Sequence, residues 1–403
     1  MPTRDDREEN ALQERRLNRV LLIYREMIPS IRLCGHCQME YLAQQGKAEY
    51  RAVRESRLKN DDLNWADIVL LGRLDSWYEY QLTKKLHEAG KYLIYIIDDD
   101  LLNIPPQISS AIHYGRRETQ QYIRGMMEMS DAILSPSPLL LKKYAGNGKR
   151  AIQIEEPALD PLPYQAHDPN QPIKIGFAGS IDRAGDIEDI LKDAMLKVKQ
   201  TYGERVQFEF FGAIPSFAEE LKARCIPYCD SYDAYRKTLG SLAWDIGLAP
   251  MPDTPFHACK HYNKFVEYGA VGVVGVFSDV MPYTRLKEMN MPTCFCENKT
   301  EAWYAAICSL IERQGEREKL RKRCTEIIQI GFSISETAKK LEKEFGTIKL
   351  MTEREKKIQG IKKLRFGALC HQVWEKWREY GWKLPVVAVQ KIRSKRRTGR
   401  ETA

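Results

Sequence analysis

Residues 259–283 read CKHYNKFVEYGAVGVVGVFSDVMPY, a short amphipathic helix with its lead-in, followed by an apolar strand. Within the helical part, apolar or small residues recur at i, i+3, i+4 and i+7, which is the pattern of one packed face. A helix that leads directly into an apolar strand is typical of α/β structure. The fold class therefore depends on whether this alternation continues along the chain.

The opposite face of this helix carries charge. At about 100° per residue, Lys260, Lys264 and Glu267 fall within roughly 60° of one another. Two ammonium groups and a carboxylate near a helix start suit a ligand that carries phosphates and hydroxyls. A solvated set of i, i+3 and i, i+4 charges is the alternative interpretation.

Strands and helices alternate over most of the chain. Apolar runs predict strands at 19–24, 67–71, 92–97, 132–135, 173–177, 206–211, 245–249 and 271–277. Helical periodicity predicts helices at 33–45, 77–89, 108–128, 186–201, 216–224, 232–241, 261–270, 299–313 and 316–347. This order predicts an α/β fold with parallel sheets.

A proline-rich segment with almost no periodicity divides the chain. The length of 403 residues leaves room for two or three domains. We predict two Rossmann-like domains with a helical basic C-terminal extension. Their bounds are a charged leader 1–17, a first domain 18–156, a linker 157–172, a second domain 173–348 and a basic amphipathic tail 349–403.

Composition predicts a cytoplasmic protein. No run reaches the roughly 18 uncharged apolar residues of a transmembrane helix, and the charged start does not resemble a signal peptide. Without such a signal, ten cysteines favour free thiols over disulfides. Cys34 and Cys37 have C-x-x-C spacing but no suitable second pair, so no metal site is predicted.

Common nucleotide-binding fingerprints are absent. No G-x-G-x-x-G follows the strand at 19–24, and the second domain offers only Gly176-Phe-Ala-Gly179-Ser180. A dehydrogenase is therefore poorly supported. The chain also lacks G-x-x-x-x-G-K-[ST], which argues against a P-loop nucleotidase.

Several segments occur in the order of a known family: Ile175-Gly-Phe-Ala-Gly-Ser180, Phe210-Phe-Gly212, Asp245-Ile-Gly-Leu-Ala-Pro250, Lys260 to Tyr268, and Ser278-Asp279. Together they resemble the donor-binding half of GT-B glycosyltransferases, particularly the retaining family-four type. The resemblance covers 170–348 and, more loosely, 18–160. It implies a GT-B architecture with a nucleotide-sugar between the domains, without a cofactor and without a metal for the chemistry.

The resemblance also implies a donor-binding set: Gly179, Ser180, Arg183, Gly212, Lys260, Lys264 and Glu267. Small residues at a strand end let backbone N–H groups approach a phosphate. Arg183 and Lys264 would neutralise the diphosphate as the glycosidic bond breaks. Glu267 matches the second glutamate of the family's E-x7-E pattern, and it would bind hydroxyls and act in catalysis. Cys259 stands where the family has its first glutamate. The alternative for Arg183 is an ordinary surface position. The alternative for Gly179 is a tight turn that binds no ligand.

Three aspartates follow the apolar strand at 92–97. Asp98 and Asp99 are our candidates for catalysis on the acceptor side, where a carboxylate would orient or deprotonate a hydroxyl and neighbouring carboxylates would raise one another's pKa. A metal-binding D-x-D and a helix N-cap cluster are the alternatives. Arg73 would be an acceptor contact, an interdomain contact or a plain surface residue.

The tail from Lys349 onward carries a net charge of +11. An apolar arc on its predicted helix consists of Phe366, Leu369, Cys370, Val373, Trp374, Trp377 and Tyr380. Together with the basic run at 391–400 it resembles an interfacial membrane anchor, so residues 361–400 are predicted to bind an anionic membrane surface at its cytoplasmic side. A helix that packs back on the first domain, with a disordered basic end, is the alternative.

These observations predict a hexosyltransferase-like enzyme that moves a sugar from a nucleotide-sugar to a glycan or lipid-linked acceptor in cell-envelope polysaccharide synthesis. The missing first glutamate leaves open a non-catalytic GT-B-like binding protein. The basic tail leaves open a nucleic-acid-directed sugar transferase, although no specific nucleic acid is expected, since any polybasic tail binds DNA weakly.

Overall fold

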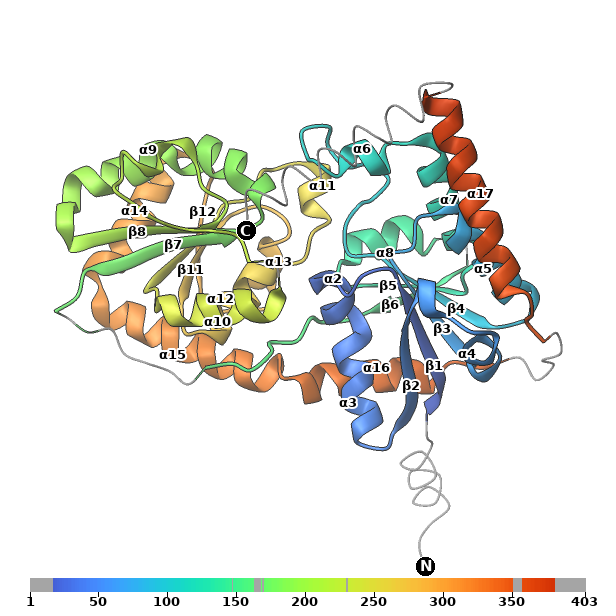
Figure 1. Cartoon of the computed structure of the whole chain (residues 1–403). Helices are drawn as coiled ribbons and strands as arrows, with labels where there is room; N and C mark the ends of the chain where they lie inside the picture. The colour runs from blue at the N-terminus through green and yellow to red at the C-terminus, as the bar shows by residue number, and fades with distance from the viewer. Residues whose placement is uncertain are drawn as a thin grey trace, which may run out of the picture.

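The computed structural model describes residues 17–146, 148–162, 168, 170–229, 231–350 and 357–380. It consists of two α/β domains that lie side by side, each built on a six-stranded parallel sheet (Figure 1). The predicted fold class, with two Rossmann-like domains and a helical extension, is confirmed. None of the described helices is long and apolar enough to cross a bilayer.

The sheet of the first domain has the strand order β2-β1-β3-β4-β5-β6, with every neighbouring pair parallel. Its strands are β1 (Leu17–Tyr24), β2 (Ala48–Arg54), β3 (Ile68–Gly72), β4 (Tyr92–Ile96), β5 (Ala132–Ser135) and β6 (Arg150–Gln153). Its helices are α2 (Pro29–Ile31), α3 (Cys37–Gln44), α4 (Asn60–Trp65), α5 (Trp77–Glu88), α6 (Ala111–Tyr114), α7 (Arg117–Met129) and α8 (Pro138–Tyr144).

Both faces of this sheet are covered. Along β1, Leu21 and Ile23 pack in one hydrophobic cluster while Val20 and Leu22 pack in another on the opposite face. Helices α5 and α7 cover the first face and α3 covers the second (Figure 1). Strands buried on both faces need continuous apolar runs, which is why the sequence revealed β1, β3, β4 and β5.

The second domain repeats the architecture with the order β12-β11-β10-β7-β8-β9. Its strands are β7 (Ile173–Gly179), β8 (Val206–Gly212), β9 (Arg224–Ile226), β10 (Ile246–Ala249), β11 (Val274–Ser278) and β12 (Cys294–Cys296). Its helices are α9 (Ala184–Tyr202), α10 (Tyr232–Leu242), α11 (Pro255–Ala258), α12 (Asn263–Ala270), α13 (Thr284–Glu288), α14 (Thr300–Glu312) and α15 (Gln314–Gly331).

One predicted element of the second domain is wrong. The helix expected at 216–224 is a single 3₁₀ turn at Ser216–Ala218, and the chain then enters the edge strand β9. Strands β2, β6, β9 and β12 were not predicted. They are short or alternate between buried and exposed residues, since they lie at or near the sheet edges.

The chain crosses between the domains twice. It leaves the first domain at Glu155 and returns through α16 (Ile334–Gly346), whose Leu341 and Phe345 pack in the first-domain core beside Val20. The two crossings touch, because the backbone N–H of Ala158 donates to the carbonyl of Phe332 at 2.8 Å. The predicted second domain therefore extends too far, since 334–348 packs on the first domain.

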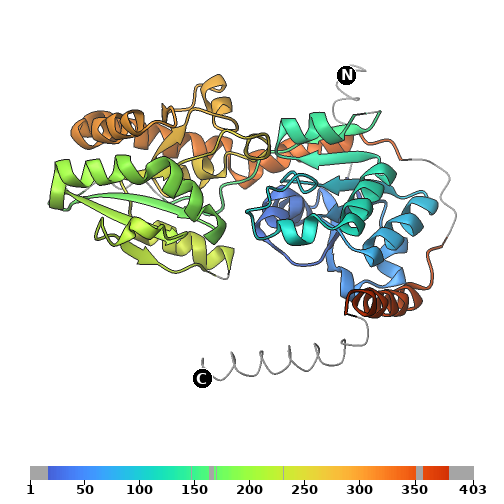
Figure 2. The ribbon, with the colours of Figure 1, turned by 90° about the horizontal axis from the view of Figure 1, so that it is seen from above.

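Helix α17 (Ile361–Tyr380) packs on the first domain beside α5 (Figures 1 and 2). Ile361 and Ala368 are buried there, and Arg365 donates to the backbone carbonyls of Glu55 and Leu58. His371 stacks on Trp77 with ring centroids 4.8 Å apart. The alternative of a helix that packs back on the first domain is thus confirmed for residues 357–380; the basic run at 391–400 lies outside the described residues.

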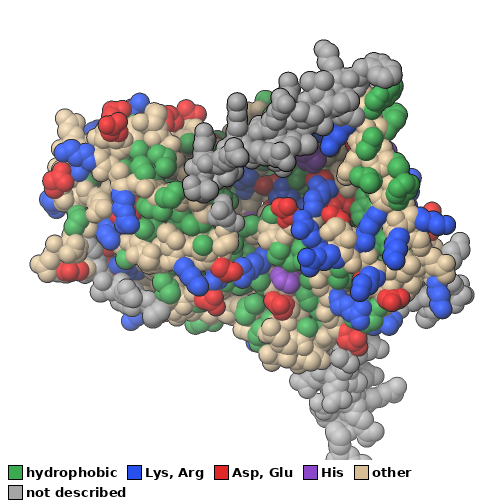
Figure 3. All heavy atoms as spheres, in the orientation of Figure 1, with side chains coloured by type: hydrophobic (Ala, Val, Ile, Leu, Met, Phe, Trp, Pro, Cys, Tyr) green, Lys and Arg blue, Asp and Glu red, His purple; other side chains and the backbone are tan. Residues whose placement is uncertain are grey.

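The predicted apolar arc of α17 does not make this contact. Phe366, Leu369, Val373, Trp374 and Trp377 are 51–68% exposed, and Figure 3 shows hydrophobic side chains along this helix. The face that packs includes Ile361, Leu364, Arg365 and Ala368. The helix therefore presents an apolar surface to its surroundings after docking on the first domain.

Candidate functional site

A cleft of about 240 Å³ lies between the two domains, where the carboxyl ends of both sheets meet. Figure 3 shows acidic and basic side chains gathered in the hollow between the domains. The lining residues are Ser30, Asp98, Asp99, Glu156, Phe177, Gly179, Ser180, Arg183, Pro250, Met251, Lys260, His261, Asn263, Lys264, Glu267 and Tyr283. Every predicted site residue except Gly212 is among them.

Two glycines shape the second-domain side of the cleft. Gly179 ends β7 and Gly212 ends β8, and the two are register partners in the sheet. A Cβ on Gly212 would lie 2.2 Å from the carbonyl oxygen of Gly179, and Gly212 has φ +84°. Only glycine fits this position. Gly212 therefore lies behind Gly179 and supports the turn without lining the cleft.

Two helices begin at this cleft. After Gly179 and Ser180 a single 3₁₀ turn leads into α9, and α12 begins at Asn263. The first N–H groups of a helix have no partner within the helix and carry partial positive charge. Two helix N-termini that open into one cleft make it suited to an anion such as a phosphate.

Lys260 does not share a helical face with Lys264 and Glu267, as the spacing had suggested. Tyr262 has ψ 42°, so α12 starts only at Asn263 and Lys260 lies in the turn before it. Its ammonium instead reaches the first domain, where Nζ lies 2.7 Å from Asp99 Oδ1. This ion pair joins the two walls of the cleft.

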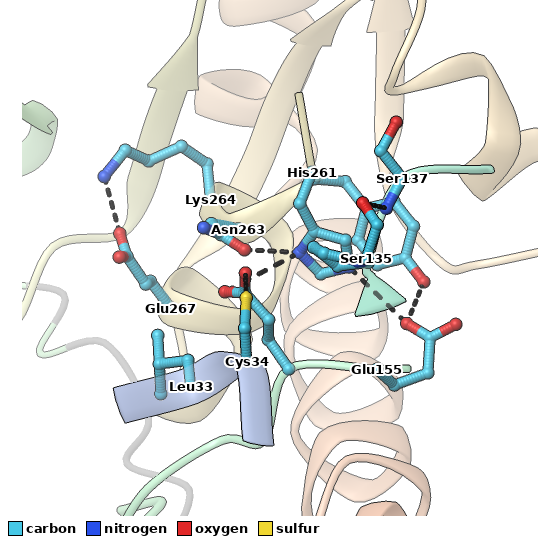
Figure 4. Close-up of polar contacts among 12 residues, drawn as sticks. Leu33, Cys34, Ser135, Ser137, Glu155, His261, Asn263, Lys264 and Glu267 are labelled. Atoms are coloured by element: carbon cyan, nitrogen blue, oxygen red, sulfur yellow. Dashed lines mark hydrogen bonds and ion pairs between the residues drawn. The ribbon is translucent and has the colours of Figure 1, made fainter. Parts of the chain in front are cut away.

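Lys264 and Glu267 form a cluster with Tyr235, a residue that sequence reasoning missed. Lys264 Nζ lies 2.5 Å from Glu267 Oε2, and Figure 4 shows the two side chains pointing toward one another. The hydroxyl of Tyr235 donates to Glu267 Oε2 at 2.8 Å and accepts from Lys264 at 3.0 Å. The ring of Tyr235 stacks on Phe211 at the end of β8. The three groups are thus held together before any ligand binds.

The guanidinium of Arg183 is anchored within the second domain. Its Nε lies 2.6 Å from Asp186 Oδ2, and Nη2 donates to the carbonyl of Pro250 at 2.6 Å. The side chain lines the cleft and is mostly buried, so the surface-arginine alternative is wrong. A phosphate in the cleft would meet a cation whose position is already set.

The predicted aspartates each have their own cation. Asp98 Oδ1 lies 3.0 Å from Arg73 Nη1, and Asp99 is paired with Lys260. Burial would raise the pKa of Asp99, but Lys260 and Arg73 outweigh it and the pKa is lowered. The expectation that neighbouring carboxylates raise one another's pKa is therefore wrong for Asp99, which is ionised at neutral pH.

Asp100 and Arg73 are parts of the first domain itself. Asp100 is 2% exposed, turns away from the cleft and lies 2.5 Å from Lys143 Nζ. Arg73 bonds to Asp98 and lies near the ring of Tyr114, so it is neither an interdomain contact nor a plain surface residue. No helix begins at the aspartates, since the next one is α6, which corrects the N-cap alternative. Among the described residues no group of three His, Cys, Asp or Glu side chains is placed to hold a metal ion.

A buried polar group at the floor of the cleft was also missed. Cys34 Sγ donates to Glu156 Oε1 at 3.2 Å, and Glu156 Oε2 lies 3.9 Å from His261 Nδ1. Figure 4 shows His261 between Asn263 and Glu155, to which it is hydrogen bonded. Burial raises the pKa of Glu156 to about 7 even though His261 opposes it. Glu155 and Glu156 lie where the chain leaves the first domain, and no pattern in the sequence there indicates buried polar residues.

Comparison with known proteins rests on structure alone, because no family model and no curated protein matches the sequence. Sucrose-phosphate synthase from Thermosynechococcus elongatus superposes with a TM-score of 0.59 at 12% identity, covering 81% of this chain and 98% of that one. HepE of Anabaena, solved with UDP and glucose, gives 0.54 at 11%, covering 82% and 100%. The chain has a GT-B fold.

An alpha-glucosyltransferase solved with UDP and a 13-mer DNA containing an HMU base has the same GT-B fold, with a TM-score of 0.54, 12% identity and coverage of 82% and 100%. HepE was solved with UDP and glucose, the alpha-glucosyltransferase with UDP and DNA, and the third structure is a sucrose-phosphate synthase. A shared fold does not imply a shared function. A function of this chain would therefore depend on the side chains that line its own cleft.

Within this GT-B frame the cleft has two chemically different walls. The second domain contributes the cations Arg183, Lys260 and Lys264, the carboxylate of Glu267 that pairs with Lys264, and two helix N-termini. The first domain and the linker contribute the carboxyl groups of Asp98, Asp99 and Glu156. A ligand that bridges the walls would thus place its anionic part on the second domain and its neutral, hydroxyl-bearing part toward the first.

Proposed function

We propose that the protein is a glycosyltransferase that transfers a hexose or related sugar from a nucleotide-sugar to a glycan or lipid-linked acceptor. The observation that carries this proposal is the convergence of two helix N-termini and three cations on one side of an interdomain cleft whose other side is acidic. In the same fold, HepE of Anabaena is described as holding UDP and glucose. A nucleoside diphosphate is the ligand that best fits this pattern of charge.

In this proposal the donor diphosphate binds at the starts of α9 and α12. Arg183 and Lys264 stabilise the negative charge that the leaving diphosphate gains when the bond to the anomeric carbon breaks. Binding would draw Lys264 from Glu267 toward the phosphates, which frees the carboxylate of Glu267 to accept hydroxyls of the ribose or the sugar. Gly179 at the end of β7 lets the backbone approach the ligand closely, and Gly212 supports this turn from behind.

The acceptor would approach from the first domain. Asp99, ionised and held by Lys260, accepts a hydrogen bond from the attacking hydroxyl, orients its oxygen toward the anomeric carbon and takes its proton as the new glycosidic bond forms. Asp98 is held in place by Arg73 and lies beside Asp99 on the first-domain wall of the cleft. The donor sugar supplies all the atoms that are transferred, so we propose that the reaction needs neither a cofactor nor a metal ion. Undiminished transfer in excess EDTA is the expected result.

Thermal unfolding in the presence of UDP, GDP, ADP and their sugars tests the donor site. A saturating ligand at about 100 times its Kd stabilises the folded state by about 2.7 kcal/mol, which is readily seen as a rise in Tm. Lys264→Ala should abolish the rise, whereas Lys287→Ala, which removes a half-exposed lysine paired with Asp279, should keep it. If none of the nucleotides raises the Tm of the wild type, the proposal is wrong. A donor screen by mass spectrometry then identifies the sugar.

A non-catalytic binding protein of the same fold is the second candidate, and Cys259 favours it. The side chain that stands in place of the family's first glutamate is buried among apolar residues of the first-domain core and does not line the cleft. Its buried thiol has a raised pKa and carries no charge. Donor hydrolysis or transfer that disappears in Glu267→Ala would exclude this candidate. Donor binding without any turnover would support it.

For the setting of the reaction we propose an anionic membrane surface, in keeping with cell-envelope polysaccharide synthesis. The apolar side chains of α17 are exposed, and residues 381–403, which follow it, contain seven basic residues and one glutamate. Apolar contact and attraction to anionic lipids reinforce one another at a membrane interface.

Flotation with phosphatidylserine-containing liposomes tests the membrane proposal. Phe366→Glu should reduce flotation strongly, while Ile330→Glu, at an equally exposed position on α15, should not. Equal flotation of both variants would contradict the proposal. Salt-sensitive DNA binding without flotation would instead favour the nucleic-acid-directed transferase.

A further inference from the structure

A second cavity, of about 850 Å³, lies between α17 and the first domain. Its inner wall is the carboxyl edge of the sheet, since Arg25 and Glu26 follow β1 and Asp75 and Ser76 follow β3. Helix α17 forms part of the outer wall. The volume is within the roughly 300–1,000 Å³ of typical small-molecule sites, and ligands of open α/β sheets bind at this edge.

The lining of this cavity combines both signs of charge with aromatic rings. Four arginines, two histidines and six Asp or Glu residues face it, so neither phosphate nor a simple cation is favoured. Trp77, Tyr78 and Tyr122 add flat apolar surface. Guanidinium groups donate hydrogen bonds and carboxylates accept them. A ligand with many hydroxyl groups, which do both, fits such a lining.

Buried ion pairs hold this lining in place. Arg25 Nη2 lies 2.7 Å from Asp75 Oδ1 and 2.9 Å from Glu79 Oε2, and both carboxylates are nearly inaccessible to solvent. The other oxygen of Glu79 has no hydrogen-bond partner among the described residues. A buried acceptor without a partner is costly to the fold. These ion pairs fix the position of the Arg25 guanidinium, which is partly exposed and faces the cavity.

A single turn of chain connects the cavity to the interdomain cleft. In α6, His113 Nε2 lies 3.1 Å from Asp75 Oδ2 at the cavity, and the next residue, Tyr114, accepts from Arg73 at 3.5 Å. Arg73 in turn holds Asp98, which lines the cleft. The two sites therefore occupy the same edge of one sheet with α6 between them.

We propose that this cavity binds sugar units of the acceptor, at a distance from the hydroxyl that reacts, and that α17 serves as one wall of the acceptor site. The inference rests on the proposed transferase function, because it assigns the acceptor of that reaction to the class of glycans. An acceptor that reaches from the cavity over α6 would present its end to Asp98 and Asp99. The lipid-linked and the free forms of such a glycan share this chemistry.

The test compares two tryptophan substitutions on neighbouring positions of α17. Gln372 lines the cavity and is exposed, so Gln372→Trp places a bulky ring in the cavity without disturbing the core. Val373 is also exposed but does not line the cavity, so Val373→Trp is the matched control. The probes are an array of neutral and acidic oligosaccharides, followed by titration of the bound ones. We expect Gln372→Trp to weaken binding by at least about tenfold and Val373→Trp to leave it unchanged.

Two further measurements keep the result unambiguous. If Gln372→Trp lowers the Tm of the ligand-free protein, Ser56→Trp, at an exposed lining position of the first domain, replaces it. The rise in Tm with UDP is measured on every variant. This inference is overturned if the wild type binds no oligosaccharide, or if Gln372→Trp binds it as tightly as the wild type does. A rise in Tm with UDP that is retained in either case would leave the proposed donor site unaffected. Glycan binding without any nucleotide response would overturn the transferase proposal alone.

Discussion

At the scale of single residues, the cluster of Lys264, Glu267 and Tyr235 sets the state of the proposed donor site when it is empty. The lysine and the glutamate neutralise one another across 2.5 Å, and the phenol completes the cluster. A nucleotide-sugar that binds as proposed would exchange these bonds for its own. The affinity for a nucleotide therefore reflects a difference between two sets of charge-assisted hydrogen bonds.

Removal of the Tyr235 hydroxyl tests this cluster. Tyr235→Phe keeps the ring that stacks on Phe211 but removes one hydrogen bond to each charged group. We expect the free energy of unfolding to fall by about 1–2 kcal/mol and the nucleotide-induced rise in Tm to shrink. Tyr232→Phe is the control, because Tyr232 stacks on Tyr235 without a hydrogen bond in this cluster. Equal effects of both variants would contradict the assignment.

Glu156 provides a pH-dependent prediction. Its pKa is raised to about 7 by burial, so the folded state holds this proton more tightly than the unfolded state does. The associated stability is fully present below the ordinary pKa of glutamate and is lost as pH rises through about 7. The pKa of His261 is also raised, because Glu155 and Glu156 outweigh the effect of its burial. The stability that His261 contributes to the fold is therefore also lost as pH rises.

The variant Glu156→Gln should remove the glutamate part of this dependence. Between pH 5 and 8, the free energy of unfolding of the variant should rise relative to the wild type by up to about 3 kcal/mol. Denaturant unfolding at several pH values provides the measurement. Parallel pH profiles of the two proteins would show that Glu156 does not titrate in this range.

At the scale of elements, the turn from β7 toward α9 depends on Gly212. Gly212→Ala would place a Cβ against the Gly179 carbonyl at a positive φ, which costs about 1–3 kcal/mol in backbone strain alone. We expect lower stability and weaker nucleotide binding, seen in Tm with and without UDP. Gly185→Ala, in the first turn of α9 with open space around it, should instead be neutral or stabilising.

The elements also show how far sequence reasoning reached. Central strands were predicted because burial on both faces demands apolar runs, and the helices beside them follow from periodicity. Eight of the nine predicted site residues line one cleft, since motifs at strand ends converge at a sheet edge. Tyr235, Glu156 and His261 were missed because their partners are distant in sequence. The pairing of Lys260 with Asp99 was missed for the same reason, as 161 positions separate the two.

At the scale of the whole molecule, the ion pair between Lys260 and Asp99 holds the cleft walls together. A double-mutant cycle with Lys260→Ala and Asp99→Ala, measured as free energies of unfolding, should give a coupling of about 0.5–3 kcal/mol. The coupling should decrease in high salt, because both side chains are partly exposed. Additive effects of the two substitutions would mean that the pair does not join the domains in solution.

The contact between Ala158 and Phe332 has a consequence for turnover. Because a hydrogen bond holds the two segments that connect the domains side by side, we expect the domains to open by rotation about these segments. Helix α17 and its cavity would move with the first domain, whereas a nucleotide bound as proposed would move with the second. We expect the spent nucleotide to exchange while the growing chain stays in place, so that several sugars are added in one encounter. Product length that is insensitive to enzyme dilution would reveal such processive synthesis.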